Sequence, residues 1–427
     1  MLSEEQESVA NECLATLKIK NEVLIQGSAG VGKTYLVNEL IKRLPYNSDK
    51  IVCSAPTHKA LAVLMSKITQ PVEFKTVHSV LQYKMSYDKE SGKKVFKPNP
   101  NPKYPPLKGV KALVIDEASM IGKDMLGYIR KYASHVKVIY LGDNKQINPV
   151  KEKDSPVFSA GITTLNLTQI VRQAKGNPII KLSRDLSLVH QKQENIQVDK
   201  NGKLLGYIFG ATEQKIIKSL AEVNGTDEMK FLAWKNDRVD ALNKKVREAI
   251  YKNPRKIEQG ESIIFQEPYG KKYANNEELK VEALEVVEKD FNVTLIDSDN
   301  VLTENKEEIV KLKVYLINQG LSYSPTRDDK SVFVIHEDSE KTFNKLKKKL
   351  KINAMHKLLS WSAFYKFVGS FADFKYNHAL TIHKSQGSTF HTSIVDVSNI
   401  MQNYTVAERQ RLLYTAITRA SNFLVIL

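Results

Sequence analysis

The 427-residue sequence has few cysteines and no long apolar run. There are two cysteines, Cys13 and Cys53, which are far apart and lack the spacing of metal ligands. This usage fits a reducing compartment, and we expect both thiols to be buried structural residues. No run approaches the about 18 consecutive apolar residues that would span a bilayer, so no membrane partner is expected.

The first residues, MLSEEQESVANECL, also lack the basic region and apolar core of a signal peptide. We therefore expect a cytoplasmic protein.

The sequence also has fewer acidic than basic residues. The chain has 48 Asp and Glu against 64 Lys and Arg, for a formal net charge of +16. Such an excess favours a polyanionic partner, because Lys and Arg neutralise phosphates and release their counterions. A contribution to solubility alone, or a lysine-rich proteome, is the alternative interpretation.

The length and the apolar pattern predict more than one α/β domain. A chain of 427 residues exceeds the size at which a single core usually stops growing. Strand-length apolar runs alternate with helical stretches, and their nearly continuous β-branched character is typical of parallel strands buried on both faces. The first set is 22–26, 50–55, 110–116 and 136–141, and the second is 229–234, 378–382, 392–397 and 422–427.

Two segments interrupt this alternation. Residues 83–97 contain two short strands around DKESG, followed by a proline-rich stretch, which predicts a β-hairpin. Residues from about 250 to 370 are rich in Lys and Glu, and we expect a smaller β-containing insertion domain closed by helices. Within it, Lys347 to Lys349 are more typical of a solvated helix face than of a DNA contact. The strand-like pieces are 280–297 and 330–338, and the amphipathic stretch is 341–367.

The stretch GSAGVGKT matches the phosphate-binding loop G-x-x-x-x-G-K-[ST] and lies between a predicted strand and a predicted helix. Glycines let backbone amides wrap phosphate oxygens, and the helix N-terminus adds its dipole. Lys33 would reach the β- and γ-phosphates, and Thr34 would hold Mg²⁺. The predicted nucleotide-binding residues of this loop are Gly27, Ser28, Ala29, Gly30, Val31, Gly32, Lys33 and Thr34.

The stretch ALVIDEASM, residues 112–120, puts two carboxylates at the end of a buried strand. Ligands of open α/β sheets bind at the carboxyl ends of the strands. Asp116 would hold the Mg²⁺ through water, and Glu117 would polarise the attacking water. Together with the phosphate loop, this pair predicts an enzyme that hydrolyses a nucleoside triphosphate.

The order of further motifs resembles the helicases of superfamily 1, in the 5′-to-3′ branch of RecD-like and phage Dda-type enzymes. The motifs are APTHKAL (55–61), TVHSVL (76–81), GDNKQINPV (142–150), LTQIVRQ (167–173), FLAWKNDRVDALN (231–243), LTIHKSQGSTF (380–390) and LLYTAITRAS (412–421). The resemblance is weak across 250–370, and it implies a bacteriophage-like protein that would act in the host cytoplasm if a phage encodes it.

In this family, two RecA-like P-loop NTPase domains clamp one ATP, and single-stranded DNA runs across them. The resemblance therefore implies a first motor domain with a β-hairpin pin inserted in it, and a second motor domain with a larger SH3-like β insertion. The implied boundaries are 1–81 and 108–180 for the first motor domain, 82–107 for the pin, 181–249 and 375–427 for the second motor domain, and 250–374 for the accessory insertion.

The resemblance also assigns roles around the nucleotide. Gln6 matches the glutamine that reads adenine. Arg172 and Arg419 match the two arginines that reach the γ-phosphate, and a surface salt bridge is the alternative for each. Gln386 and Gly387 match the motif that touches nucleotide and DNA together.

The stretch GDNKQINPV could be only a turn, but its place in the motif order suggests more. Gly142 and Asp143 would turn the chain into the cleft, so that Gln146 reaches the γ-phosphate or the attacking water. The loop would then link hydrolysis to the grip on DNA.

A DNA track is implied at matching positions in both motor domains. Backbone amides and small polar side chains can hold phosphates without reading bases, and aromatic rings can stack on bases of any sequence. Any one histidine alone would more often be structural. The implied DNA-binding residues are Pro56, Thr57, His58, Thr76, His78, Tyr87, Phe96, Trp234, Asn236, Thr381, His383, Lys384 and Ser385.

We therefore expect an ATP- and Mg²⁺-dependent helicase that moves 5′ to 3′ on single-stranded DNA and opens duplex DNA. The expected partners are single-stranded and forked DNA, with replication or recombination proteins as further candidates, and the protein is expected to be a monomer. An RNA helicase or ribonucleoprotein remodeller of the same superfamily is one alternative. A nucleotide-gated DNA-binding scaffold is another, against which the intact site residues count.

Overall fold

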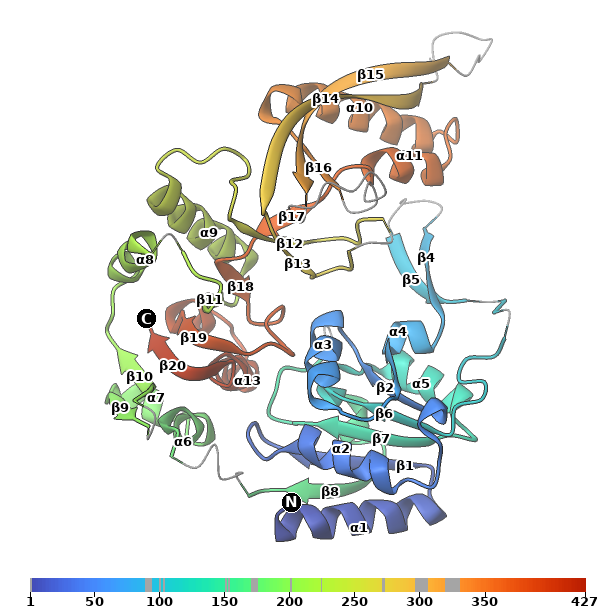
Figure 1. Cartoon of the computed structure of the whole chain (residues 1–427), viewed down its shortest axis with the longest axis vertical. Helices are drawn as coiled ribbons and strands as arrows, with labels where there is room; N and C mark the ends of the chain where they lie inside the picture. The colour runs from blue at the N-terminus through green and yellow to red at the C-terminus, as the bar shows by residue number, and fades with distance from the viewer. Residues whose placement is uncertain are drawn as a thin grey trace. The chain divides into compact units, whose positions relative to one another are not determined.

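The computed structural model divides the chain into two compact units, which we describe separately (Figure 1). Unit 1 comprises Met1–Tyr83, Pro98–Ile250 and His378–Leu427, and unit 2 comprises Lys84–Lys97 and Tyr251–Asn377. The structure describes residues 2–88, 94–99, 101–102, 104–149, 152, 154–169, 176–199, 202–223, 225–270, 273–295, 306–318 and 331–427. No helix within these ranges is both long and apolar enough to cross a membrane. The finer division into four domains remains a prediction.

The first sheet of unit 1 is parallel throughout and has the order β3-β2-β6-β7-β1-β8. The four predicted strands are confirmed, and their side chains are nearly all buried. The edge strands β3 and β8 were not predicted, because exposed polar residues alternate in them with buried ones. The strands are β1 Glu22–Gly27, β2 Ile51–Ala55, β3 Glu73–Thr76, β6 Ala112–Ile115, β7 Lys137–Gly142 and β8 Thr163–Leu167.

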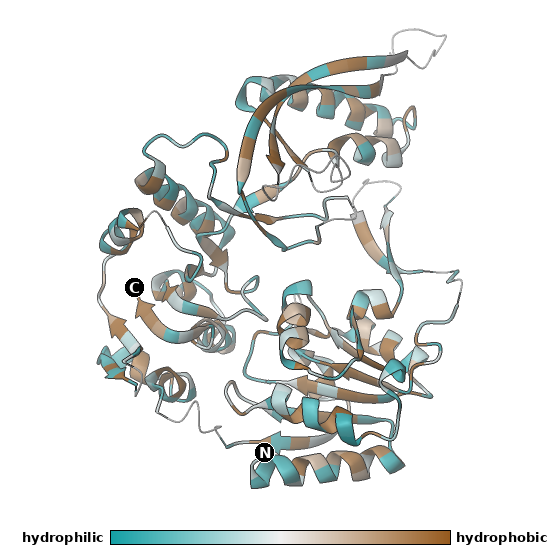
Figure 2. Cartoon of the chain, viewed as in Figure 1, coloured by the Kyte–Doolittle hydropathy of each residue, from teal (hydrophilic) through white to brown (hydrophobic). Residues whose placement is uncertain are grey.

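Helices connect and cover these strands. They are α1 Glu4–Ile19, α2 Lys33–Arg43, α3 His58–Lys67, α4 Val77–Val80 and α5 Lys123–Tyr132, with short 3-10 turns η1 Ser48–Lys50, η2 Ala118–Met120 and η3 Pro156–Phe158. Apolar side chains of the sheet and of the helices pack into two buried clusters. The strands of this sheet are mostly brown, that is hydrophobic, in Figure 2. Cys13 of α1 and Cys53 of β2 lie in one of these cores as free thiols, as predicted. Burial raises the pKa of each thiol to about 12.

The second sheet of unit 1 has the order β18-β11-β19-β20-β10-β9. It is parallel except at its edge, where β9 pairs antiparallel with β10. Neither of these two strands was predicted. A Cβ on Gly206 of β10 would lie 2.0 Å from the Asn195 carbonyl oxygen, so a glycine is required where the edge strand approaches. The strands are β9 Asn195–Val198, β10 Leu204–Phe209, β11 Met229–Ala233, β18 Ala379–Thr381, β19 Phe390–Val395 and β20 Ala420–Ile426.

The strand predicted over 392–397 runs too far. Strand β19 ends at Val395, because the side chain of Asp396 accepts a hydrogen bond from the Asn399 backbone N–H and so caps the next helix. The helices of this half are α6 Pro178–Arg184, α7 Leu188–Gln191, α8 Glu213–Glu222, α9 Asn236–Tyr251, α12 Val397–Met401 and α13 Val406–Ile417.

Unit 2 contains the predicted hairpin as a two-stranded sheet, together with two three-stranded antiparallel sheets. Helices α10 and α11 pack on the β14-β15-β16 sheet around an aromatic cluster that includes Phe291, Phe364 and Phe371. The comparison of this insertion with an SH3 fold remains a prediction. The elements are β4 Tyr83–Tyr87, β5 Lys94–Pro98, β12 Ser262–Phe265, β13 Glu278–Lys280, β14 Ala283–Leu295, β15 Lys306–Asn318, β16 Val332–Ile335, α10 Glu337–Met355, α11 Trp361–Val368 and β17 Phe374–Tyr376.

Two strand-like pieces predicted in unit 2 each divide in the structure. The piece 280–297 contains the end of β13 and all of β14, which belong to different sheets, and its last residues lie outside the described part. The piece 330–338 contains β16 and the start of α10, because the His336 side chain accepts a hydrogen bond from the Asp338 N–H and begins the helix. Lys347 to Lys349 are exposed on α10, as predicted.

Candidate active site

The phosphate loop connects β1 to α2, in the position that the motif requires. Gly30 and Gly32 have φ values of 83° and 78°, a left-handed conformation that favours glycine, and Gly32 caps α2. The Lys33 ammonium donates to the carbonyl oxygens of Gly27 (2.6 Å) and Ser28 (3.1 Å). The lysine is therefore folded across the loop that would hold the phosphates.

A cavity of about 370 Å³ lies against this loop in unit 1. It brings together residues from the carboxyl ends of the first sheet and from the second half of the unit, including α6 and the segment that precedes β20. Among its lining are the predicted site residues Ala29, Gly30, Lys33, Thr34, Asp116, Glu117, Gln146, Gly387 and Arg419.

Asp116 and Glu117 follow β6 and face this cavity. Glu117 has a φ of 53°, and its backbone N–H donates to Asp116 Oδ1 at 2.8 Å. Burial raises the pKa of Asp116, and the positive charges of Lys33 and Lys67 oppose this shift. Burial, and then the charge of Asp116, raise the pKa of Glu117 as well. A raised pKa is what a group that accepts a proton near neutral pH needs.

Gln146 lies in the loop that follows β7. A Cβ on Gly142 would lie 2.8 Å from the Phe158 ring, so a larger residue here would require that ring to shift. Gln146 is 5% exposed, and its Oε1 has no hydrogen-bond donor among the described residues. A buried acceptor of this kind is satisfied when a water or ligand donor enters. Its place beside Lys33 and Glu117 fits the predicted contact with the attacking water.

Arg419 follows α13 and is 5% exposed. Its guanidinium donates to the carbonyl oxygens of Thr415 (3.1 Å) and Ser388 (3.1 Å) and to the hydroxyl of Thr418 (3.3 Å). Burial lowers the pKa of Arg419, and the negative charge of Glu117 opposes this. An arginine stays protonated under such shifts, so a fixed positive charge faces the carboxylate pair.

Hydrogen bonds also join helix α13 to the phosphate loop and to the loop after β7. The Tyr414 hydroxyl accepts from the Ala29 N–H of the phosphate loop (3.2 Å) and donates to Asp143 Oδ2 (2.5 Å). The Thr415 hydroxyl accepts from the Ile147 N–H at 3.2 Å. None of these contacts was predicted, because each depends on how two segments distant in sequence meet.

Gln386 and Gly387 make close contacts across the same boundary. The Gln386 amide donates to the Ile147 carbonyl oxygen at 3.2 Å. Gly387 has a φ of 73°, and a Cβ there would lie 2.7 Å from the Cβ of Ala60 in α3. Gly387 lines the cavity, whereas Gln386 contacts the loop that carries Gln146.

Gln6 lies beside the phosphate loop. Its amide donates to the Val31 carbonyl oxygen (3.1 Å), and its Oε1 accepts from the Ser3 N–H (3.1 Å) as part of the cap of α1. Gln6 is 3% exposed. Its contact with adenine remains a prediction.

The second predicted arginine, Arg172, lies outside the described residues. Conversely, the structure adds cavity residues that no motif indicated, among them Lys67 at the end of α3 and Asn177 at the start of α6. Only the fold brings these isolated polar residues to the site, so sequence reasoning had no signal for them.

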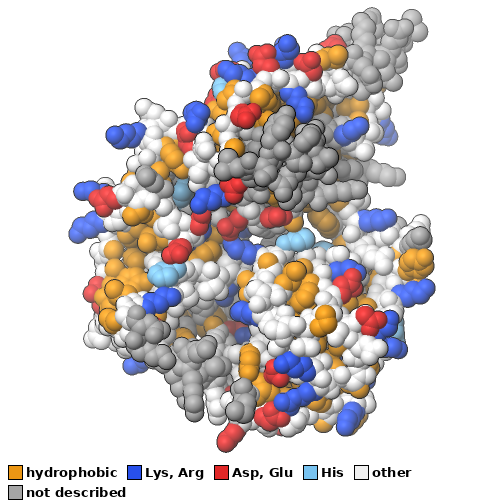
Figure 3. All heavy atoms as spheres, viewed as in Figure 1, with side chains coloured by type: hydrophobic (Ala, Val, Ile, Leu, Met, Phe, Trp, Pro, Cys, Tyr) orange, Lys and Arg blue, Asp and Glu red, His pale blue; other side chains and the backbone are white. Residues whose placement is uncertain are grey.

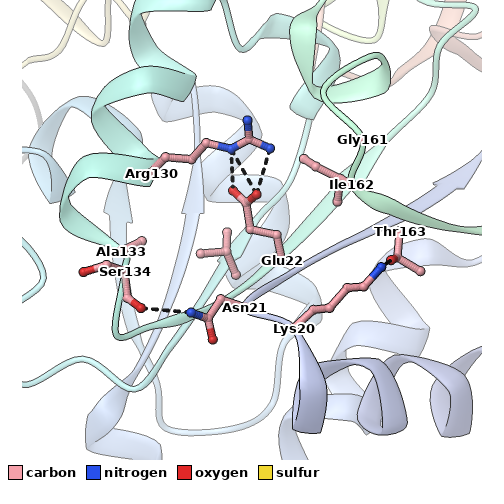
Figure 4. Close-up of a pocket in the computed structure, with 10 residues that line it drawn as sticks. Lys20, Asn21, Glu22, Arg130, Ala133, Ser134, Gly161, Ile162 and Thr163 are labelled. Carbon is pink, nitrogen blue, oxygen red and sulfur yellow. Dashed lines mark hydrogen bonds and ion pairs between the residues drawn. The ribbon is translucent and has the colours of Figure 1, made fainter.

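A second cavity, of about 280 Å³, lies at the amino ends of β1, β7 and β8, away from the carboxyl-end site (Figure 4). Its polar groups pair with one another. Arg130 bonds Glu22 (2.8 Å), the Lys20 ammonium donates to the Thr163 hydroxyl (2.8 Å), and the Asn21 amide donates to a backbone carbonyl. We interpret this cavity as structural.

Comparisons with known proteins agree with this geometry. Residues 1–205 match the family model of an AAA domain, and residues 376–427 match that of a UvrD-like helicase C-terminal domain. The chain is 28% identical to the ATP-dependent DNA helicase dda of Enterobacteria phage T4, a match that covers 98% of this chain and 97% of that protein. It is 24% identical to the ATP-dependent DNA helicase Pif1 of Campylobacter jejuni, covering 94% and 87%.

The chain is a superfamily 1 helicase of the Pif1/Dda type. The Pif1 helicase from Bacteroides, crystallised in complex with ADP-AlF3 and ssDNA, matches this helicase at 17% identity with a TM-score of 0.51. The match covers 100% of this chain and 92% of that one. The likeness confirms the fold, with two RecA-like domains.

Most of the predicted DNA-track hydroxyls in this helicase serve to shape its backbone. The hydroxyls of Thr57 and Thr76 accept the N–H groups that begin α3 and α4. The Thr381 hydroxyl accepts from the Lys384 N–H (3.2 Å), and the Ser385 hydroxyl donates to a backbone carbonyl at 2.8 Å. The Thr57, Thr76 and Thr381 hydroxyls only accept in these bonds, so their O–H groups, together with backbone amides, are the donors that these segments can offer to phosphates.

The predicted histidines of the helicase differ in exposure. His58 is exposed at the start of α3, beside half-buried Pro56. His78 packs edge-to-face on Tyr83, with the ring centroids 5.2 Å apart. Burial lowers the pKa values of His78 and His383, so both are neutral at neutral pH.

The remaining predicted DNA contacts are aromatic or lie at element ends. Trp234 is half-buried, and the Lys235 ammonium lies 5.2 Å from its ring centroid. Asn236 is exposed as the first residue of α9, and Phe96 is 53% exposed on β5. The side chain of Tyr87 lies outside the described part. The DNA roles of all these residues remain predictions.

Proposed function

We propose that this chain hydrolyses ATP to move 5′ to 3′ along single-stranded DNA and to unwind duplex DNA. The observation that carries the proposal is the cavity in which the phosphate loop, Asp116, Glu117, Gln146 and Arg419 converge. The two relatives described above are both named ATP-dependent DNA helicases, and the polarity is that of the family branch. A Pif1 structure with a TM-score of 0.51 concerns DNA unwinding at forked dsDNA.

The loop amides and Lys33 would bind the phosphates of ATP. Thr34 and Asp116 would hold Mg²⁺, which when bound neutralises charge on the β- and γ-phosphates. Among the described residues no three His, Cys, Asp or Glu side chains cluster as metal ligands, which is consistent with a Mg²⁺ bound mainly by phosphates and water.

The chemistry then falls to three side chains around the γ-phosphate. Glu117 would accept the proton of the attacking water, and Gln146 would orient that water. Arg419 would stabilise the charge that develops on the phosphoryl group. An arginine in this role is worth about 10³ to 10⁵ in rate, and a general base about 10² to 10⁴.

Coupling to DNA would pass through the contacts between the two sheets of unit 1. Ile147, one residue after Gln146, is bonded to Gln386 and Thr415 from the second half. Gly387 packs on α3, and the predicted DNA residues Thr57 and His58 are the N-cap and the first residue of this helix. A change at the γ-phosphate can therefore reach the DNA segments through directly packed backbone.

The same chain supplies both the phosphate loop and Arg419 to one cavity, and we therefore propose that a monomer forms a complete ATP site. Replication or recombination proteins are the partners that we propose for such an enzyme.

The test measures ATPase and unwinding on partial duplexes with 5′ or 3′ single-stranded tails, in DNA and RNA forms, with Lys33→Ala as the inactive control. We expect unwinding of the 5′-tailed DNA and none by the variant. A preference for the 3′ tail would overturn the polarity, and equal activity on RNA would indicate an RNA helicase. Full biological activity of Lys33→Ala would indicate a scaffold.

A further inference from the structure

We propose that Tyr414 is a positioning residue of the ATP site, whose hydroxyl fixes the phosphate loop, the Gln146 loop and the helix before Arg419 relative to one another. The inference rests on the proposed function, since it concerns the same site. Tyr414 is not among the residues that the motifs assigned to nucleotide or DNA.

The hydroxyl of Tyr414 uses both its donor and its acceptor capacity in protein contacts. It accepts from the Ala29 N–H at 3.2 Å and donates to Asp143 Oδ2 at 2.5 Å. Tyr414 is 3% exposed and Asp143 is 2% exposed. A hydrogen bond to a carboxylate that is shielded from water is stronger than a neutral one, and it is costly to leave unmade.

The protonation states support this geometry. Burial, and then the charge of Asp143, raise the pKa of the Tyr414 phenol above its usual range. The phenol therefore keeps its proton at neutral pH and can act as the donor. The second Asp143 carboxylate oxygen, Oδ1, accepts the Lys145 N–H at 3.0 Å, so this aspartate also shapes the start of the Gln146 loop.

The neighbouring residue extends the same connection. The Thr415 hydroxyl accepts the Ile147 N–H, and the Thr415 carbonyl oxygen accepts from the Arg419 guanidinium. Tyr414 and Thr415 thus bind the Gln146 loop on both sides of Gln146. They belong to the helix whose end positions Arg419. The distance between the water-orienting amide and the arginine therefore depends on these two side chains.

The test is Tyr414→Phe, which keeps the ring and removes only the hydroxyl. We expect kcat for DNA-stimulated ATP hydrolysis to fall about 10- to 100-fold, because small misplacements of catalytic groups cost rates of this order. The KM for ATP should change by less than about threefold, since the phosphate loop and Lys33 remain.

A matched control is Tyr140→Phe. Tyr140 is also buried, and its hydroxyl also donates to a carboxylate, Glu22 Oε1 at 3.0 Å, but Glu22 lines the cavity at the amino edge of the sheet, away from the ATP site. Each variant loses one hydrogen bond to a carboxylate, and Tyr414→Phe also loses the acceptor of the Ala29 N–H, so Tyr414→Phe should lose more stability to denaturant. Only Tyr414→Phe should lose kcat.

A second variant keeps the inference testable if Tyr414→Phe does not fold. Asp143→Asn retains an acceptor but removes its charge, and we expect a smaller fall in kcat. Where both variants fold, the double variant should be no slower than Tyr414→Phe alone, because the two groups act as one unit.

The outcomes separate the inference from the proposed function. A wild-type chain without ATPase activity would overturn the proposed function. An active wild type with an equally active Tyr414→Phe, or a double variant whose losses add, would overturn the role of Tyr414. An equal fall of kcat in Tyr140→Phe would show a general effect of stability and would overturn it as well.

Discussion

At the scale of single residues, the site combines two carboxylates with fixed positive charges around one cavity. Asp116 and Glu117 are adjacent in sequence and face Lys33 and Arg419. Such an arrangement stabilises charge on a transferring phosphoryl group without rearrangement during the reaction. It also holds the carboxylates in an environment that disfavours their ionised form.

We predict that the acidic limb of the kcat/KM profile for ATP lies above pH 4.5, the ordinary value for a glutamate. The reason is that burial and Asp116 raise the pKa of Glu117, and only its ionised form can accept a proton. The measurement is steady-state ATPase at saturating DNA across a pH window that includes the reference values of carboxyl groups and histidine, about 4.3 and 6.5. An acidic limb at or below the ordinary glutamate value would contradict the prediction.

The same shift predicts a stability effect. Since the folded state holds the Glu117 proton more tightly than the unfolded state does, ionisation of Glu117 destabilises the fold as the pH rises through its raised pKa. Glu117→Gln should therefore unfold at a higher temperature than the wild type at pH 7 while losing ATPase activity. A lower unfolding temperature at pH 7 would count against the raised pKa.

Gly387 gives a residue-scale prediction about close packing. Gly387→Ala places a Cβ 2.7 Å from Ala60 at a φ of 73°. We expect the free energy of unfolding to fall by about 1–3 kcal/mol, as in other overpacked or strained positions, together with loss of unwinding. The control is Gly127→Ala within α5, where nothing lies within 4 Å and the helix should gain about 1 kcal/mol. Equal effects in denaturant melts would exclude the steric explanation.

At the scale of elements, short loops after parallel strands carry most of the chemistry. The loops after β1, β6 and β7 all open on the same edge of the first sheet, so the phosphate loop, the carboxylate pair and Gln146 meet there. The loop after β7 differs from the others in being bonded on both sides to the second half of unit 1.

Because of these bonds, Gln146→Ala should change coupling more than binding. We expect fewer base pairs unwound per ATP hydrolysed, since the loop contacts both the cavity and the second sheet. Parallel measurements of ATPase and unwinding on one forked substrate give the ratio. If the number of base pairs unwound per ATP is unchanged, the loop that carries Gln146 does not couple hydrolysis to unwinding and is only a turn.

The hairpin β4-β5 gives the second element-scale prediction. The resemblance to superfamily 1 helicases implies that this hairpin is a pin that parts the duplex, and Phe96 is 53% exposed on β5. Shortening the segment from Ser86 to Lys94 should lower duplex unwinding much more than DNA-stimulated ATPase. Equal loss of both activities would exclude a wedge role, leaving a hairpin that only packs within the protein.

At the scale of the whole molecule, charge is the main property to explain. The net charge is +16, and Lys and Arg side chains are interspersed with acidic ones over the visible face (Figure 3). On this face, the positive side chains are therefore dispersed rather than gathered in one large patch.

We predict a strong salt dependence of single-stranded DNA binding. The logarithm of the binding constant should fall linearly with the logarithm of salt concentration, with a slope of about −0.7 for each phosphate neutralised. Fluorescence anisotropy with a labelled oligonucleotide, between about 50 and 200 mM salt, gives the slope. Affinity that does not change over this range would show that the positive charge serves solubility.

The sequence predicted best those features that depend on local pattern. Buried strands such as β2 and β6 are continuous apolar runs, and the phosphate loop and Asp116 are local motifs. It failed at edge strands such as β3 and β9, whose polar residues resemble loops, and at Asp396, where a cap ended a strand early. Contacts such as that of Tyr414 with Ala29 could not be predicted, because they form only when distant segments pack together.

The two buried cysteines have a practical consequence for labelling this protein with fluorescent dyes. Cys13 and Cys53 are fully buried in one core, and a pKa of about 12 leaves almost no reactive thiolate at neutral pH. Maleimide dyes should therefore label engineered surface cysteines while leaving both native thiols untouched. The native thiols should react only when this core opens. Their slow rate of labelling would therefore measure how often the core opens.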